Sequence, residues 1–172
     1  MIDAAATDGP PPPGSRGLRV SDRFQRSRVP VLPTVLFGDA SADYREMARD
    51  ALLEGRTATV MRTVADGGEL LAYLARAGAS APSLIFVDVA LPGEPGGLAL
   101  IRKLKSDDRL RRIPVVALGT DDDPQTVASA YDAGVNTYIV KPVTFLALVR
   151  LMKVFTAYWL ETAELPPGSE AA

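Results

Sequence analysis

The chain has 172 residues, of which 47% are hydrophobic, so it is long enough and apolar enough for one domain with a buried core plus tails. Its 19 basic and 21 acidic residues give a formal net charge of −2, so we expect no nucleic-acid partner and no membrane partner. It contains no Cys and no His, which excludes disulfides, ordinary zinc sites and catalysis by a histidine base. Any chemistry must use carboxylates, lysine, hydroxyls and a hard metal ion.

The two ends of the chain differ in composition from its middle. Residues 1–32 are rich in Pro, Gly, Ser, Asp and Arg without periodicity, which predicts a disordered tail, and we expect a second short tail over 166–172. The N-terminus lacks the basic start and apolar block of a secretory signal, and no apolar run is long enough to span a bilayer. We therefore expect a cytoplasmic protein with one domain over 33–165.

Within that domain, short apolar runs alternate with helical patterns. The predicted strands cover 34–37, part of 57–64, 83–87, 114–118 and 137–140, and the predicted helices cover 42–55, 66–78, 97–107, 123–134 and 144–161. Asp66 with Glu69 resembles a capping box, and Asp123 before Pro124 is a typical helix start. Alternating strands and helices predict an α/β fold, a doubly wound five-stranded parallel sheet with five helices.

Charged residues follow several of the predicted strands. Asp39 comes after the first strand, Asp88 after the third and Lys141 after the fifth. The carboxyl ends of parallel strands share one edge of the sheet, where ligands of such folds bind. Two neighbouring carboxylates suit Mg²⁺, and a lysine beside them can neutralise a further anionic group. This arrangement suits phosphoryl chemistry with Asp88 as the nucleophile.

Four segments carry a family resemblance. In order and spacing, "VLFGDASAD", "LIFVDVALPGEPGG", "IPVVALGT" and "YIVKP" resemble the receiver domain of bacterial response regulators, which has the CheY-like, flavodoxin-like fold. The resemblance extends from about residue 34 to 165. The later segment "TAYWLETAELP" is similar to the end of stand-alone response regulators that pair with bacterial phytochromes.

The resemblance implies a role for each residue at the sheet edge. Asp88 would be the phosphorylated residue and, with Asp39 and the backbone carbonyl of Ala90, a ligand of Mg²⁺. Lys141 would pair with the phosphoryl group, and its peptide bond to Pro142 is expected to be cis. The chain would then be part of a two-component phosphorelay, a signalling phosphoprotein rather than an enzyme.

Two positions depart from the family pattern. Gly38 stands where the family usually has a first acid, and such an outer-shell loss typically lowers affinity or activity about 10–100-fold. Gly119 stands at the Ser/Thr switch position, so a hydrogen bond to the phosphoryl worth roughly 1.5–3 kcal/mol is lost. Thr120 is the remaining hydroxyl candidate for phosphoryl binding, although it comes one residue late and should point elsewhere. Tyr138 matches the aromatic switch position, or is a packed aromatic only.

The last predicted helix is apolar on two sides. One stripe covers the sheet, and the second consists of Leu146, Leu151, Val154 and Tyr158. The second stripe predicts a partner surface, which we expect to form a homodimer; a fold-back of the C-terminal tail would also cover it.

Three functions remain open from the sequence. The first is a stand-alone, atypical response regulator that accepts phosphate on Asp88 from a histidine kinase, of phytochrome type. The second is a pseudo-receiver that acts as a phosphorylation-independent binding or dimerisation module. The third is a phosphatase of the haloacid-dehalogenase type, which needs an acid two residues after the nucleophile, where this chain has Ala90.

Overall fold

The computed structural model describes residues 32–56, 58–77 and 81–164, in which strands and helices alternate. The elements are β1 (Thr34–Gly38), α1 (Ala42–Glu54), β2 (Val60–Val64), α2 (Gly67–Ala77), β3 (Leu84–Asp88), α3 (Gly97–Ser106), β4 (Val115–Gly119), α4 (Pro124–Asp132), β5 (Thr137–Val140), α5 (Phe145–Phe155) and the π-helix η3 (Thr156–Thr162). The predicted tail over 166–172 and nearly all of that over 1–32 lie outside the described residues.

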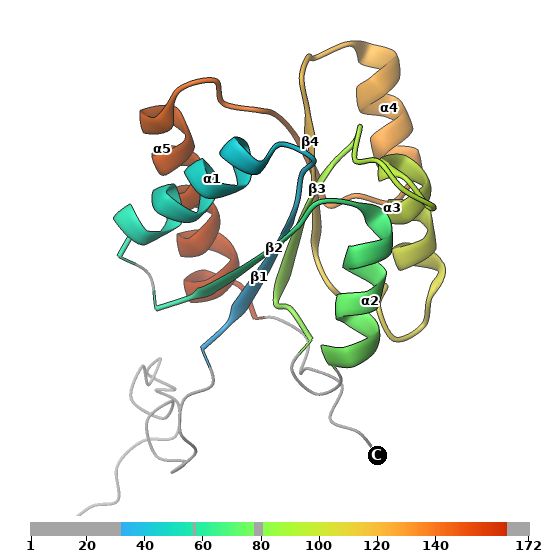
Figure 1. Cartoon of the computed structure of the whole chain (residues 1–172), viewed down its shortest axis with the longest axis horizontal. Helices are drawn as coiled ribbons and strands as arrows, with labels where there is room; N and C mark the ends of the chain where they lie inside the picture. Colours follow the sequence, from blue (N-terminus) through green and yellow to red (C-terminus); the bar gives the residue numbers. More distant parts are fainter. Residues whose placement is uncertain (1–31, 57, 78–80, 165–172) are drawn as a thin grey trace, which may run out of the picture. The chain divides into compact units, whose positions relative to one another are not determined.

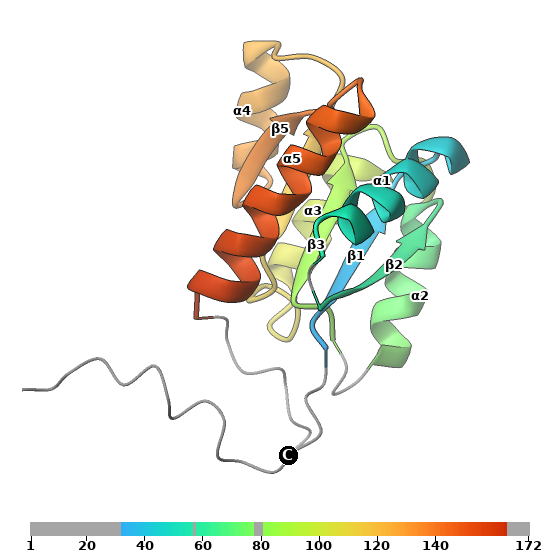
Figure 2. The same cartoon turned by 90° about the vertical axis from the view of Figure 1, so that its left-hand side faces the viewer.

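The five strands form one parallel sheet in the order β2-β1-β3-β4-β5. Helices α1 and α5 cover one face, and α2, α3 and α4 cover the other (Figure 1). Figure 2 shows α1 and α5 side by side over the sheet. The predicted fold class is confirmed. The strand order reverses between β1 and β3, and ligands of such sheets bind where the order reverses, at the carboxyl ends of the strands.

Residues alternate between two hydrophobic clusters along each central strand. Leu36, Ile85 and Val87 pack on the side of α2 and α3, whereas Phe37 and Phe86 pack on the side of α1 and α5. Both faces of β1, β3 and β4 are buried, which explains why these strands read as continuous apolar runs rather than alternating ones. A carboxylate at the end of such a strand is therefore held by a rigid, close-packed scaffold.

The helix starts agree with the capping residues in the sequence. The carboxylate of Asp66 accepts the N–H of Glu69 at 2.8 Å, and the Glu69 carboxylate accepts the N–H of Ala65 at 2.7 Å. This is a capping box whose return bond reaches one residue further back than usual. Asp123 accepts the N–H of Thr126 at 2.9 Å in front of Pro124, so this predicted helix start is also confirmed.

The C-terminal helix differs from its prediction in two ways. It is not one α-helix to residue 161, because the α-helical turns end at Phe155 and π-helical turns follow. The Thr156 hydroxyl donates to the carbonyl of Met152 at 2.9 Å, and such side-chain bonds compete with the helical ladder. Leu151, expected on the partner-facing stripe, instead packs against the core, while Val154 and Tyr158 of that stripe are exposed.

Candidate functional site

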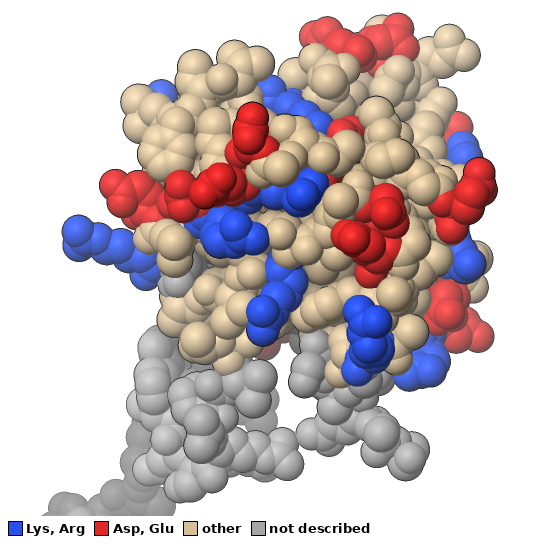
Figure 3. Space-filling model, in the orientation of Figure 1, with Lys and Arg blue, Asp and Glu red and all other residues tan. Residues whose placement is uncertain are grey.

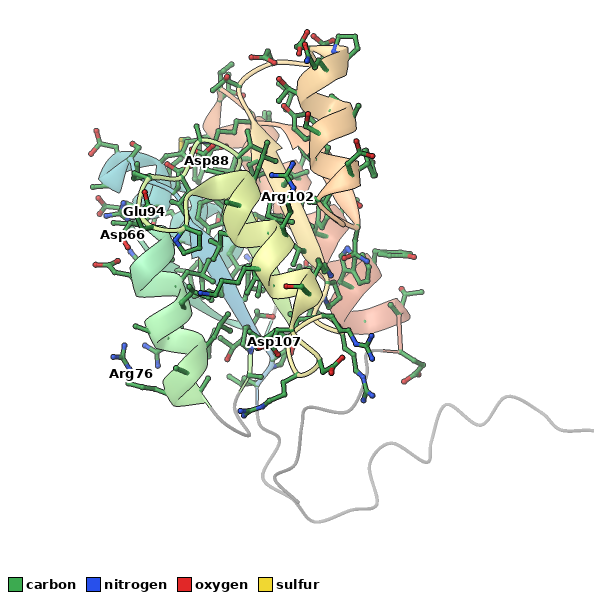
Figure 4. The ribbon with its side chains drawn as sticks, turned by 90° about the vertical axis from the view of Figure 1, so that its right-hand side faces the viewer. Asp66, Arg76, Asp88, Glu94, Arg102 and Asp107 are labelled. Atoms are coloured by element: carbon green, nitrogen blue, oxygen red, sulfur yellow. The ribbon has the colours of Figure 1, made fainter. Side chains whose placement is uncertain are left out.

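The predicted meeting of two acids and a lysine is present at the carboxyl edge of the sheet. Asp39 directly follows β1, Asp88 ends β3, and Lys141 directly follows β5. Asp39 and Asp88 are only 1% and 6% exposed. The ammonium of Lys141 lies 2.6 Å from an oxygen of each carboxylate and so bridges them. Figure 4 shows Asp88 near the upper edge of the sheet, with Glu94 of the following loop lower and to its left.

The second oxygen of each carboxylate is held by the backbone. Asp39 accepts the N–H of Ser41 at 2.9 Å, and Asp88 accepts the N–H of Ala90 at 2.9 Å. Burial alone would lower the pKa of Lys141, but the hydrogen bonds and charges of the two carboxylates outweigh it and raise that pKa. Lys141 therefore stays protonated and is the cation that bridges the two carboxyl groups.

This set of donors fits the predicted metal. Hard divalent cations prefer carboxylate, carbonyl and water oxygens, and Mg²⁺ commonly takes only one or two carboxylates. Among the described residues no three Asp or Glu side chains cluster, so the remaining ligands would come from a backbone carbonyl, predicted at Ala90, and from water or phosphate oxygens. Asp39 and Asp88 are thus the side chains that would hold Mg²⁺.

Gly38, at the position of the missing first acid, is covered by apolar side chains. A Cβ placed there would lie 3.2 Å from Leu91, 3.4 Å from Leu70 and 3.5 Å from Val64. The side of the site that an outer acid would occupy is therefore closed by hydrocarbon. Leu91 follows Asp88 in the same loop, and its covering role was not evident from the sequence.

Tyr138 fills the space beside Gly119. A Cβ on Gly119 would overlap the phenol oxygen of Tyr138 and lie 2.5 Å from its Cζ, so no other residue fits at 119 while the ring is there. The Tyr138 hydroxyl donates to the backbone carbonyl of Asp121 at 2.7 Å. Burial first, and then the nearby carboxylates of the β4–α4 loop, raise the pKa of Tyr138, so its hydroxyl stays protonated and able to donate.

Two further expectations concern the loops after β4 and β5. Thr120 is exposed and its hydroxyl donates to the Asp121 carboxylate at 3.3 Å, a partner other than the Asp88 site. The expected cis bond between Lys141 and Pro142 is wrong: in the described chain the cis peptide bond is Glu94–Pro95. The backbone N–H of Lys141 donates to the Gly119 carbonyl at 2.7 Å, which ties the end of β5 to the end of β4.

Gly97 brings α3 against the backbone at the end of β3. A Cβ on Gly97 would overlap the carbonyl of Val89 and lie 2.9 Å from the carbonyl oxygen of Asp88. Both neighbours are backbone atoms, which cannot turn aside as a flexible side chain can. The close approach therefore fixes the turn that aims Asp88.

We expect Gly97→Ala to lower the free energy of unfolding by about 1–3 kcal/mol, because the added methyl group must displace this backbone. Urea unfolding of the variant and wild type measures the effect. Gly68→Ala is the matched control, since its methyl group would meet only the Asp66 carboxylate, at 3.2 Å, in the first turn of α2. An equal loss in both variants would mean that the crowding at Gly97 is not the cause.

Comparison with known proteins agrees with this fold. Residues 35–153 match the response regulator receiver domain, and the chain belongs to this family. Response regulator Rcp1 of Synechocystis is 29% identical over 136 residues, which cover 77% of this chain and 91% of Rcp1.

Solved structures with a similar fold include other response regulators. The phosphorylated cyanobacterial phytochrome response regulator RcpA superposes with a TM-score of 0.72 at 33% identity, covering 79% of this chain and 99% of RcpA. The Mn²⁺-bound form of Rcp1 superposes with a TM-score of 0.69 at 27% identity, covering 78% and 99%. This chain is therefore a two-component response regulator by its fold and relatives.

The surface carries charges of both signs. Figure 3 shows acidic and basic side chains interspersed on one face, with an acidic group over the start of α4, where Asp121, Asp122 and Asp123 are exposed. In the part of the chain that the structure describes, no helix is both long and apolar enough to cross a bilayer.

Proposed function

We propose that this protein is a response regulator that accepts a phosphoryl group on Asp88 from a histidine kinase, in a phytochrome-type pathway. The observation that supports this most directly is the buried pair of Asp39 and Asp88 bridged by Lys141. Burying a charged carboxylate costs free energy unless the charge has a partner. Here Asp88, the second acid Asp39 and the cation Lys141 converge from three strand ends. The relative RcpA has been solved in a phosphorylated form.

The transfer step requires little covalent chemistry from the chain. A carboxylate oxygen of Asp88 attacks the phosphorus of the phosphohistidine; the new O–P bond forms as the P–N bond breaks, and the imidazole leaves and takes up a proton. Lys141 then has an additional anionic group to neutralise, which positions and stabilises the transferred phosphoryl. Mg²⁺, held by Asp39 and Asp88, would supply further charge neutralisation on the phosphoryl oxygens.

The test is incubation of the full chain with Mg²⁺ and acetyl phosphate, followed by measurement of the intact mass. We expect the added mass of one phosphoryl group, sensitive to hydrolysis as an acyl phosphate is. A mass that stays unchanged at saturating acetyl phosphate, and with a cognate kinase, would contradict the proposal.

The second candidate is the pseudo-receiver, a binding module that works without phosphorylation. Two observations favour it: Leu91 covers Gly38, and Tyr138 fills the space at Gly119. Both replace polar partners of the phosphoryl site by other contacts. The same mass measurement separates the candidates, because a pseudo-receiver takes up no phosphoryl group from acetyl phosphate.

Self-association through the C-terminal helix is also part of the proposal. Val154 and Tyr158 are 65% and 56% exposed, although they are apolar or aromatic. These two side chains form part of the wall of a groove of about 340 Å³. The groove is lined by Asn136, Thr137, Val154, Phe155, Tyr158 and Trp159. An apolar groove next to protruding apolar side chains suits a second copy of the same surface.

We expect Val154→Glu to raise the dimer dissociation constant at least about tenfold, because it places a charge at an apolar contact. Light scattering or sedimentation at micromolar concentration measures this. Leu53→Glu is the matched control, since Leu53 is 67% exposed on α1 and is not among the residues that line the groove. Leu151 is unsuitable because it packs on the core. A wild type that stays monomeric at high concentration would contradict self-association.

A further inference from the structure

Tyr44 lies beside the site although it follows no strand. It belongs to the first turn of α1, where its backbone N–H donates to the capping hydroxyl of Ser41 at 3.1 Å. Its ring is half-buried and packs on Phe37, with ring centres 6.1 Å apart. The first turn of α1 therefore points an aromatic side chain at the edge of the sheet where Lys141 emerges.

The ring of Tyr44 contacts the bridging cation. The ammonium of Lys141 lies 5.1 Å from the ring centre, within the range of a cation–π interaction. Lys141 thus has three partners, two carboxylates and one aromatic face. The ring carries no charge, unlike the two carboxylates. It can therefore hold the ammonium while the carboxylates bind a metal ion or a phosphoryl group.

The hydroxyl of Tyr44 contributes less than its ring. It donates to the carbonyl of Pro142 at 3.4 Å, which is long for a hydrogen bond from a hydroxyl. Burial, followed by the charges of Asp39 and Asp88, raises the pKa of Tyr44 to about 12, so the phenol is neutral and adds no negative charge to the site. The contact that acts on Lys141 is therefore the aromatic face.

We infer that Tyr44 is a positioning residue for phosphoryl binding: its ring holds the Lys141 ammonium where it meets the phosphoryl group on Asp88. The inference rests on the proposed function. Gly119 offers no hydroxyl to the phosphoryl, and among the described residues Lys141 is the cation in contact with Asp88. The placement of this one side chain therefore matters more than it would in a site with a second donor.

The experiment compares Tyr44→Phe and Tyr44→Leu in the full chain, alone and combined with Lys141→Ala. The rate of phosphoryl uptake from acetyl phosphate with Mg²⁺ is followed by intact mass; Asp88 displaces acetate as its O–P bond forms. Tyr44→Phe should stay within about threefold of wild type, because only the long hydrogen bond is lost. Tyr44→Leu should be about tenfold slower, because the cation–π contact is lost. Tyr131→Leu, at an exposed tyrosine on α4, is the matched control.

The double variants separate positioning from space-filling. If Tyr44 acts through Lys141, Tyr44→Leu has no further effect in the Lys141→Ala chain. An equal slowing in both backgrounds would overturn the inference, and so would a Tyr44→Phe variant as slow as Tyr44→Leu. In either case, phosphoryl uptake by the wild type would leave the proposed function standing. A wild type without any uptake would overturn the proposed function and this role together. Thermal unfolding of each variant identifies any loss of fold.

Discussion

Asp88→Asn is expected to abolish phosphoryl uptake from acetyl phosphate and Mg²⁺. The amide has nearly the shape of the carboxylate but lacks the nucleophilic oxygen charge. Asp88 is 6% exposed at the end of β3, and its second oxygen accepts the Ala90 N–H, a bond that the amide oxygen of Asn can also accept. The fold should survive, because Lys141 keeps its contact with Asp39 at 2.6 Å.

The loss is read as intact mass after incubation, with thermal unfolding as the check on folding. Asp108→Asn is the control, because the Asp108 side chain is 89% exposed and pairs with Arg111 at the surface. Phosphoryl uptake that persists in Asp88→Asn would place the acceptor elsewhere in the chain, and the assignment of Asp88 would be wrong.

Gly119→Thr is expected to expel Tyr138 from its place over the β4–α4 loop. The new Cβ would lie 2.5 Å from Cζ of the ring, so ring and side chain cannot coexist. The bond from Tyr138 to the Asp121 carbonyl is then lost, and the added hydroxyl becomes available to a phosphoryl group. That hydrogen bond is worth about 1.5–3 kcal/mol, which changes an equilibrium roughly 10–150-fold.

The variant should therefore respond more strongly to a phosphoryl mimic than wild type does. In wild type Tyr138 is already in place, and beryllofluoride should change its resonances little. In Gly119→Thr the ring starts displaced, and the mimic, bound by the added hydroxyl, should change the surroundings of the displaced ring. Nuclear magnetic resonance spectra of both proteins, with and without the mimic, measure this. Thr120→Ala is the control, because the exposed Thr120 hydroxyl donates to the Asp121 carboxylate rather than to the Asp88 site. An equally large response in wild type would mean that coupling reaches Tyr138 by another route.

Most of the fold was predictable because it depends on periodic patterns. The buried strands, the acids at helix starts and the alternation of elements are local signals, and the sheet order follows once the family is known. The end of the last helix was not predictable in this way. The apolar stripe of α5 continues through η3, while the change to π-helical turns accompanies a single hydroxyl–carbonyl bond at Thr156.

Some residues of the site were likewise predictable from local sequence patterns, and others were not. Asp39, Asp88 and Lys141 each follow a strand, so parallel topology alone brings them together. Gly38 and Gly119 indicated only that a side chain was missing at each position. The residues that fill the space, Leu91 and Tyr138, come from other parts of the chain. Tyr44 was missed because an aromatic residue in a first helical turn has no sequence signal that distinguishes a cation contact from ordinary packing.

The bridge formed by Lys141 has a consequence for how the protein survives in the cell. Lys141 is an internal counter-ion for two acids that would otherwise repel each other inside the protein. The side chains are 15%, 2% and 9% exposed, so dissolved salt screens the arrangement weakly. The domain can therefore fold and persist before it meets a divalent ion. Under the proposed function, the supply of Mg²⁺ then governs its readiness for phosphoryl transfer, while the lysine bridge is already present without the metal.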